Sequence, residues 1–268
     1  MKSLLVFAHK AEASSFIREL QLKRDNSYSG ELYLSEEISL LICGEGPMRS
    51  SAKLSKAIHH LQLKNIELII NMGIAGSLND KLEINKIYDF SVVLAEASFG
   101  KPEFKGFESL QRDSKNYLIT ALDRVKTAAY REQLSQFAEA VDREAWGLAF
   151  VCDEYNIPFS CYKLISDVAG PETSCFDVKE KAKFYSESLL EFYFSHISKQ
   201  SLPQKPEENE SFENETLKKN FFFSSTQKKS FEKLSLSLRK MNPSLFSEIL
   251  SSENLDEICQ EFKRPKDR

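Results

Sequence analysis

Short apolar runs alternate with amphipathic segments along the first 200 residues of this 268-residue chain. Runs of roughly four to eight residues rich in Val, Ile, Leu, Phe and Tyr predict buried strands. The predicted strands are Ser3–Ala8, Glu31–Leu34, Ile38–Cys43, Ile66–Met72, Tyr88–Leu94, Tyr117–Ala121 and Ser160–Ile165. Apolar residues at helical spacing predict helices between them, at Ser50–Leu63, Ala128–Phe137, Arg143–Glu154 and Asp177–Ser195. Strands alternating with helices indicate an α/β fold, with a mixed, mostly parallel central sheet flanked by helices.

The pattern changes after Gln200. Residues 201–220 are polar, rich in Glu and interrupted by two prolines, which predicts a linker. Residues 221–268 carry apolar stripes at helical spacing and predict a helical C-terminal extension. We therefore expect an α/β domain over residues 1–200, followed by the linker and the extension. The extension is expected to be dispensable for chemistry, and its apolar stripes are expected to pack on its own core, a second copy or a partner protein. The alternative is a weakly helical, disordered tail.

Composition excludes several classes of function. The net charge of −4 is too small to indicate attraction to nucleic acid or to a membrane surface. No run approaches the ~20 apolar residues of a membrane span, and the first apolar run is too short for a signal peptide. Five cysteines without close pairing predict reduced thiols rather than a disulfide framework. We expect a cytoplasmic protein with neither nucleic acid nor membrane as a partner.

The segment Val141–Gly170 carries the most informative motif. An acidic cluster, Asp142-Arg143-Glu144, precedes an apolar helix, and Asn156-Ile157-Pro158 then breaks that helix. A strand follows and delivers Ser166-Asp167 at its end. This order places a carboxylate at the C-terminal end of a buried strand, where open α/β sheets bind their ligands.

This layout resembles the purine nucleoside phosphorylase/nucleosidase superfamily, in which a V-[DE]-M-E-[AG]-A helix precedes an [IV]-S-D-x-A-D strand end. The N-terminal strand and the turn with Glu12 look like those of methylthioadenosine/adenosylhomocysteine nucleosidases, which have a glutamate at the same offset. Residues 68–78, LIINMGIAGSL, are similar to the I-I-N-T-G-S-A-G-G-L of that family. The resemblance covers roughly residues 1–200 and implies a homodimer that binds a small-molecule nucleoside.

Cleavage of a purine N-glycosidic bond passes through an oxocarbenium-like transition state and needs an acid, a held water and a grip on the sugar. The resemblance implies that Asp167 protonates purine N7, that Glu12 activates the water and that Glu144 binds the ribose hydroxyls. Gly73, Ala75 and Gly76 are expected to let the backbone approach the sugar, with Arg143 and Ser166 completing the binding site. The ordinary alternatives are a turn cap for Asp167, a first-turn helix residue for Glu12 and a surface residue for Glu144.

Three positions depart from the family pattern. Arg143 stands where a methionine packs under the ribose, and a cation there opposes an oxocarbenium ion unless it turns away or pairs with Asp142 or with an anion of the substrate. Ile74 replaces a serine or threonine, and Gly170 replaces the second acid of the strand-end pattern. These departures keep open a catalytically weak protein that binds a nucleoside and has a regulatory role.

Arginines indicate whether the nucleophile is phosphate or water, because phosphorolysis needs arginines to bind the phosphate. Asn71 occupies the place where related phosphorylases have an arginine, and Arg49 is the candidate that remains nearby. We therefore expect hydrolysis of a purine or 5′-modified purine nucleoside, with a phosphorylase and a futalosine-type nucleosidase as alternatives. No cofactor is expected, and no metal site, since His59 and His60 lie in a helical pattern without a third ligand. Residues 121–125 are expected near the base, without an assigned contact.

Overall fold

The computed structural model describes residues 3–63, 66–98, 101–171 and 180–198. Its strands are β1 (Ser3–Phe7), β2 (Lys23–Arg24), β3 (Glu31–Leu34), β4 (Ile38–Ile42), β5 (Leu68–Ser77), β6 (Ile87–Asp89), β7 (Val92–Ser98), β8 (Lys101–Glu108), β9 (Tyr117–Thr120), β10 (Ala140–Asp142) and β11 (Phe159–Val168). Its helices are α1 (Ser14–Glu19), α2 (Pro47–Leu61), α3 (Ala128–Ser135), α4 (Ala145–Glu154) and α6 (Ala182–Phe192), which continues into a π-helical turn at Tyr193–Ile197. The expected linker and helical extension lie outside the described residues.

One sheet contains all of these strands, in the order β2-β3-β4-β1-β5-β10-β9-β7-β8, and β11 joins it by pairing with both β5 and β6. The pairs β1/β4, β1/β5, β5/β11, β9/β10 and β7/β9 are parallel. Antiparallel pairs occur at β2/β3, β3/β4, β5/β10, β6/β11 and β7/β8. The predicted α/β fold, with a mixed and mostly parallel centre, is confirmed.

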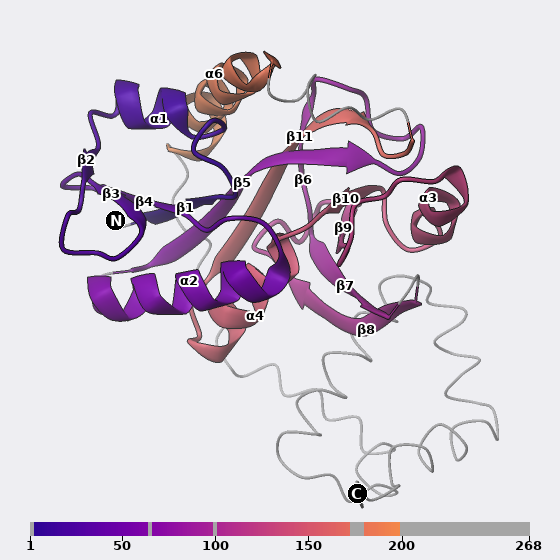
Figure 1. Ribbon diagram of the computed structural model, residues 1–268, viewed down its shortest axis with the longest axis horizontal. Helices are drawn as coiled ribbons and strands as arrows, with labels where there is room; N and C mark the ends of the chain where they lie inside the picture. Colours follow the sequence, from indigo (N-terminus) through magenta and orange to yellow (C-terminus); the bar gives the residue numbers. More distant parts are fainter. Residues whose placement is uncertain (1–2, 64–65, 99–100, 172–179, 199–268) are drawn as a thin grey trace, which may run out of the picture. The chain divides into compact units, whose positions relative to one another are not determined.

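Helices cover both faces of the sheet, with α1 and α6 on one side and α2 and α4 on the other (Figure 1). Alternation along β1 explains this arrangement, because successive side chains of a strand point to opposite faces. Val6 belongs to the apolar cluster that contains Leu54 of α2, whereas Phe7 belongs to the cluster with Phe16 of α1 and Leu189 of α6. A strand with helices on both faces must be apolar throughout, as β1 is.

The strand predicted to end at Met72 continues to Ser77 as β5. It continues because β11 is equally long and pairs along it, matching Lys163 with Gly73 and Asp167 with Gly76. The register shifts between Ile165 and Asp167, which marks a bulge next to the predicted acid. The glycine-containing segment is thus a strand end and not a strand-to-helix turn.

The run Tyr88–Leu94, predicted as one strand, divides into β6 and β7, because β6 pairs with β11 whereas β7 pairs with β8 and β9. The elements α1, β2, β8 and β10 were not predicted. Three of them are short, with six residues in α1, two in β2 and three in β10. Among the described residues, no helix is both long and apolar enough to cross a membrane.

Candidate active site

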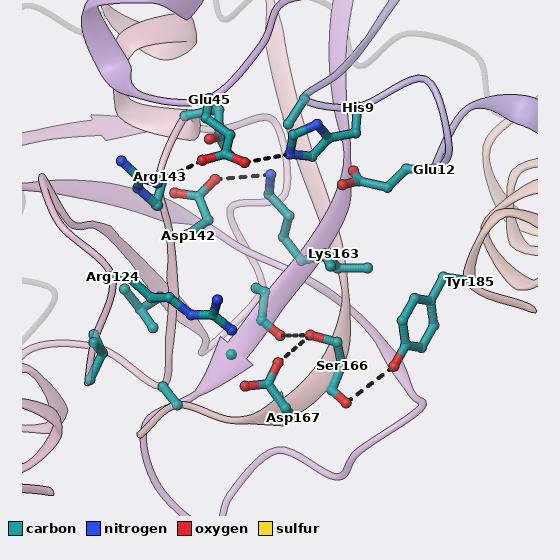
Figure 2. A pocket seen from close by; sticks show the side chains of 18 of the residues that line it. His9, Glu12, Glu45, Arg124, Asp142, Arg143, Lys163, Ser166, Asp167 and Tyr185 are labelled. Carbon is teal, nitrogen blue, oxygen red and sulfur yellow. Dashed lines mark hydrogen bonds and ion pairs between the residues drawn. The ribbon is translucent and has the colours of Figure 1, made fainter. Parts of the chain in front are cut away.

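A cavity of about 780 Å³ opens where several parallel strands end. Its lining comes from the segments that follow β1, β4, β9 and β10 and from the C-terminal parts of β5 and β11 (Figure 2). The sequence-predicted residues on its wall are Glu12, Ala75, Gly76, Arg143, Glu144, Ser166 and Asp167. Seven of the eight predicted positions therefore share one cavity. The eighth, Gly73, lies next to the carboxylate of Glu12.

Glu12 lies on the tight turn between β1 and α1, where its backbone N–H donates to the carbonyl of His9. Its carboxylate packs against the backbone of Gly73, where the Cβ of any larger residue would come within 2.7 Å of Oε2. Glycine at that position leaves the space that the Glu12 carboxylate occupies. Burial, and then the neighbouring Glu144, raise the pKa of Glu12 to about 8, against the opposing influence of Lys163.

Glu144 lies between β10 and α4 and is only 7% exposed, which excludes the surface role considered from sequence. Its Oε1 accepts a hydrogen bond of 3.1 Å from the backbone N–H of Gly46. Burial and the adjacent Asp142 raise the pKa of Glu144 to about 7, while Lys163 and the Gly46 hydrogen bond favour its ionised form. A carboxylate held in this way can accept hydrogen bonds from two sugar hydroxyls.

Asp167 lies at the bulge near the end of β11 and is partly exposed to the cavity. The hydroxyl of Ser166 donates to Oδ1 of Asp167, and it also lies 3.3 Å from the carbonyl of Ala75. Tyr185 of α6 donates to the carbonyl of Ser166 at 3.4 Å. These contacts join the end of β11 to β5 and α6, and Asp167 lines the cavity there.

Lys163 is the principal site residue that sequence reasoning missed. It is 2% exposed, and its Nζ lies 2.9 Å from Oδ2 of Asp142. Asp142 also accepts hydrogen bonds from the Thr120 hydroxyl and from the backbone N–H of Ala145. A lysine inside an apolar strand is the available signal, because lysine is rarely buried unless it is paired.

The pairing of Arg143 with Asp142 considered from sequence is wrong, since Asp142 pairs with Lys163. Arg143 instead places Nη1 at 2.7 Å from Glu45 and donates from Nη2 to the carbonyl of Leu122. The other oxygen of Glu45 lies 2.9 Å from Nε2 of His9. Glu45 therefore bridges His9 and Arg143 at the cavity wall (Figure 2). Glu45 therefore places a negative charge next to Arg143, the residue that stands where the family has a methionine.

Arg49, the candidate considered for phosphate binding, does not line the cavity, and neither does Asn71, which stands where related phosphorylases have an arginine. Asn71 is 1% exposed and donates from its side chain to the carbonyl of Val6, so it helps to join β5 to β1. Arg49 is exposed on α2 and packs beside Gly44. The cations that do line the cavity are His9, Lys10, Arg124, Lys126, Arg143 and Lys163.

Within the described residues, no group of three or more His, Cys, Asp or Glu side chains is arranged to hold a metal ion. His59 lies 2.9 Å from the Tyr155 hydroxyl, and His60 lies 2.7 Å from Asp25. Both histidines are thus engaged in contacts between side chains of the surface.

No protein-family model matches the chain. A 5′-methylthioadenosine/S-adenosylhomocysteine nucleosidase of Bacillus cereus strain B4264 is 27% identical over 173 residues, which cover 53% of this chain and 73% of that protein. The nucleosidase of Bacillus cytotoxicus is 24% identical over an alignment of the same length and coverage.

Solved structures share the fold. The S. pneumoniae 5′-methylthioadenosine/S-adenosylhomocysteine nucleosidase with a transition-state inhibitor aligns with a TM-score of 0.61 at 17% identity, covering 71% of this chain and 96% of that one. A futalosine hydrolase mutant of Helicobacter pylori aligns with a TM-score of 0.61 at 16% identity, covering 72% and 97%. The resemblance to nucleosidases noted in the sequence is thereby confirmed in both sequence and fold.

Proposed function

We propose that this chain hydrolyses the N-glycosidic bond of a purine or 5′-modified purine nucleoside and releases the free base. The observation that carries the proposal is the gathering of Glu12, Glu144 and Asp167 around one cavity, in three different environments. Carboxyl groups in different environments can take different roles in a single reaction. The relatives, which are nucleosidases acting on 5′-modified adenosines by name, support the same reaction class.

In the proposed reaction, water attacks C1′ of the sugar while the bond from C1′ to purine N9 breaks. Glu12 takes the proton of the water, and a carboxyl with a pKa of about 8 is basic enough to hold that proton near neutrality. Asp167 gives its proton to N7, so the base leaves as a neutral molecule. Glu144 accepts hydrogen bonds from the ribose hydroxyls and, like Glu12, places negative charge near the cationic sugar.

The positive charges near the sugar are balanced by neighbouring acids. Lys163 is paired with Asp142, and Arg143 is paired with Glu45. Arg143 therefore no longer argues against an oxocarbenium-like transition state, because its charge is offset by a carboxylate at 2.7 Å. These pairs support an active enzyme over a nucleoside-binding protein without catalysis.

Base release is expected not to require phosphate. The site presents Glu12 to hold a water, whereas Asn71 and Arg49 lie outside the cavity wall. The test incubates the purified chain with a panel of purine nucleosides, with and without inorganic phosphate, and measures the free base. Equal rates in both conditions are predicted. Strict dependence on phosphate, with a sugar 1-phosphate as product, would favour the phosphorylase alternative.

We also infer that the enzyme works in the cytoplasm as a homodimer. The three cysteines within the described residues, Cys43, Cys152 and Cys161, are buried free thiols, which suits a reducing compartment. The dimer rests on the resemblance to the nucleosidase family. Light scattering on the full chain measures the oligomeric state directly.

A further inference from the structure

The end of the cavity around Asp167 carries an arginine that the proposed chemistry does not use. Arg124 lines the cavity together with Ser166 and Asp167, and its guanidinium points toward the Asp167 carboxyl (Figure 2). Nearby in the chain, Arg131 of α3 donates to the carbonyl of Ala169, just beyond β11, at 3.5 Å. The proposed general acid and the Arg124 guanidinium therefore line the same end of the cavity.

The two kinds of purine differ at the atom next to N7. A 6-oxopurine presents two acceptors on this edge, O6 and N7, whereas a 6-aminopurine presents the N7 acceptor beside an N–H donor at position 6. A guanidinium has five N–H donors and no acceptor. With Asp167 at N7, a neighbouring arginine meets position 6 favourably only if the substituent is an oxygen.

We propose that Arg124 makes the enzyme selective for nucleosides of 6-oxopurines, the bases hypoxanthine and guanine, over their 6-amino counterparts. This inference rests on the proposed function and names its substrate class. When the bond between C1′ and N9 breaks, its electron pair passes into the purine, and in a 6-oxopurine part of that charge reaches O6. A hydrogen bond from Arg124 to O6 then becomes stronger in the transition state, which raises the rate as well as the affinity.

Asp123 is the competing group at this end of the cavity. It is exposed, lines the same wall and offers an acceptor that suits a 6-amino group. The two residues predict opposite preferences, so a comparison of matched substrates decides between them. Arg124 is favoured because it is less exposed than Asp123 and its guanidinium extends into the cavity (Figure 2).

The experiment uses two matched pairs, inosine with adenosine and their 5′-methylthio derivatives, and measures kcat/KM for each. The wild type is expected to favour the 6-oxo member of each pair by about 10-fold or more, the scale on which such contacts discriminate bases. Arg124→Met is expected to lower this ratio about 10- to 100-fold. Lys126→Met, which removes a neighbouring exposed cation of the same wall, should leave the ratio within about threefold of the wild type.

A wild-type preference for the 6-amino members, or a ratio that Arg124→Met does not change, would overturn the selectivity while leaving the hydrolysis intact. Absence of base release from all four nucleosides would instead count against the proposed function. Calorimetric binding of free hypoxanthine and adenine tests the selectivity without turnover, and tighter binding of adenine contradicts it. Arg124→Gln, which keeps a polar side chain, serves as a second variant if the methionine variant does not fold.

Discussion

Asp167→Asn is expected to lower kcat at least ~10²-fold, the usual scale for the loss of a general acid. An asparagine keeps the shape and can accept the Ser166 hydrogen bond but has no carboxyl proton to give to N7. Steady-state kinetics of base release measure the effect. Asp25→Asn is the matched control, because Asp25 pairs with His60 and does not line the cavity. Wild-type turnover of Asp167→Asn would show that the acid has been assigned to the wrong residue.

Glu12→Gln is the companion variant and should be similarly damaging, because an amide cannot take the proton of the water. It should also stabilise the fold at alkaline pH. The pKa of Glu12 is raised from 4.5 to about 8, so the folded protein prefers the protonated form, and stability falls as the pH rises from about 4.5 to 8. Glutamine removes this penalty, and unfolding at pH 9 should show a gain on the order of 1–4 kcal/mol. An unstable but active Glu12→Gln would contradict both roles.

Lys163→Met is expected to destabilise the protein by about 3–5 kcal/mol, because it leaves Asp142 as a buried charge without its cation. Lys81→Met is the matched control. Lys81 and Glu139 are also 2.9 Å apart, but Lys81 is 70% exposed, so its loss should cost about 1 kcal/mol or less. Denaturant unfolding at neutral pH compares the two variants. Equal losses of stability in the two variants would show that the buried Lys163–Asp142 pair stabilises the protein no more than the exposed Lys81–Glu139 pair.

Lys163 also has a predicted effect on the pH dependence of catalysis. It lowers the pKa of Glu12, so its removal should raise that pKa further. The base must be ionised to accept a proton, and the acidic limb of kcat/KM should therefore move to higher pH in Lys163→Met. The double variant Lys163→Met, Asp142→Asn has no unpaired charge at this position and should regain part of the stability that Lys163→Met loses. If the acidic limb of kcat/KM lies at the same pH in Lys163→Met as in the wild type, Glu12 is not the group whose titration produces that limb.

The sequence predicted the strands with clear apolar runs and three carboxyl groups of the site. Glu12 and Asp167 each follow a predicted strand, and parallel strands bring their carboxyl ends to one edge of a sheet. Glu144 follows β10, which was not predicted, so only the resemblance placed it in the site. Local pattern and the resemblance were therefore enough to place them together. The length of β5 was not predictable in the same way, because it depends on pairing with β11, more than 80 residues away along the chain.

The charge pairs depend on tertiary contacts that no local pattern displays. Glu45 and Arg143 are 98 positions apart, and they meet only because the segment after β4 lies beside the start of α4. Asp142 and Arg143 are neighbours in sequence but turn to different partners, since successive residues at a strand end point in opposite directions. Glu144 has the sequence context of an exposed helix start, but it is 7% exposed and accepts a hydrogen bond from the backbone N–H of Gly46, 98 positions away.

Cleavage in water enriched with oxygen-18 tests the central claim most directly. The purified chain is incubated under single-turnover conditions, in the presence of phosphate, with the purine nucleoside of the panel that it cleaves fastest, and the sugar product is analysed by mass spectrometry. Hydrolysis at this site predicts the free base together with a sugar that carries one oxygen-18 atom at C1′. Formation of the sugar 1-phosphate without the label, or intact nucleoside across the whole panel after prolonged incubation with folded protein, would contradict the account.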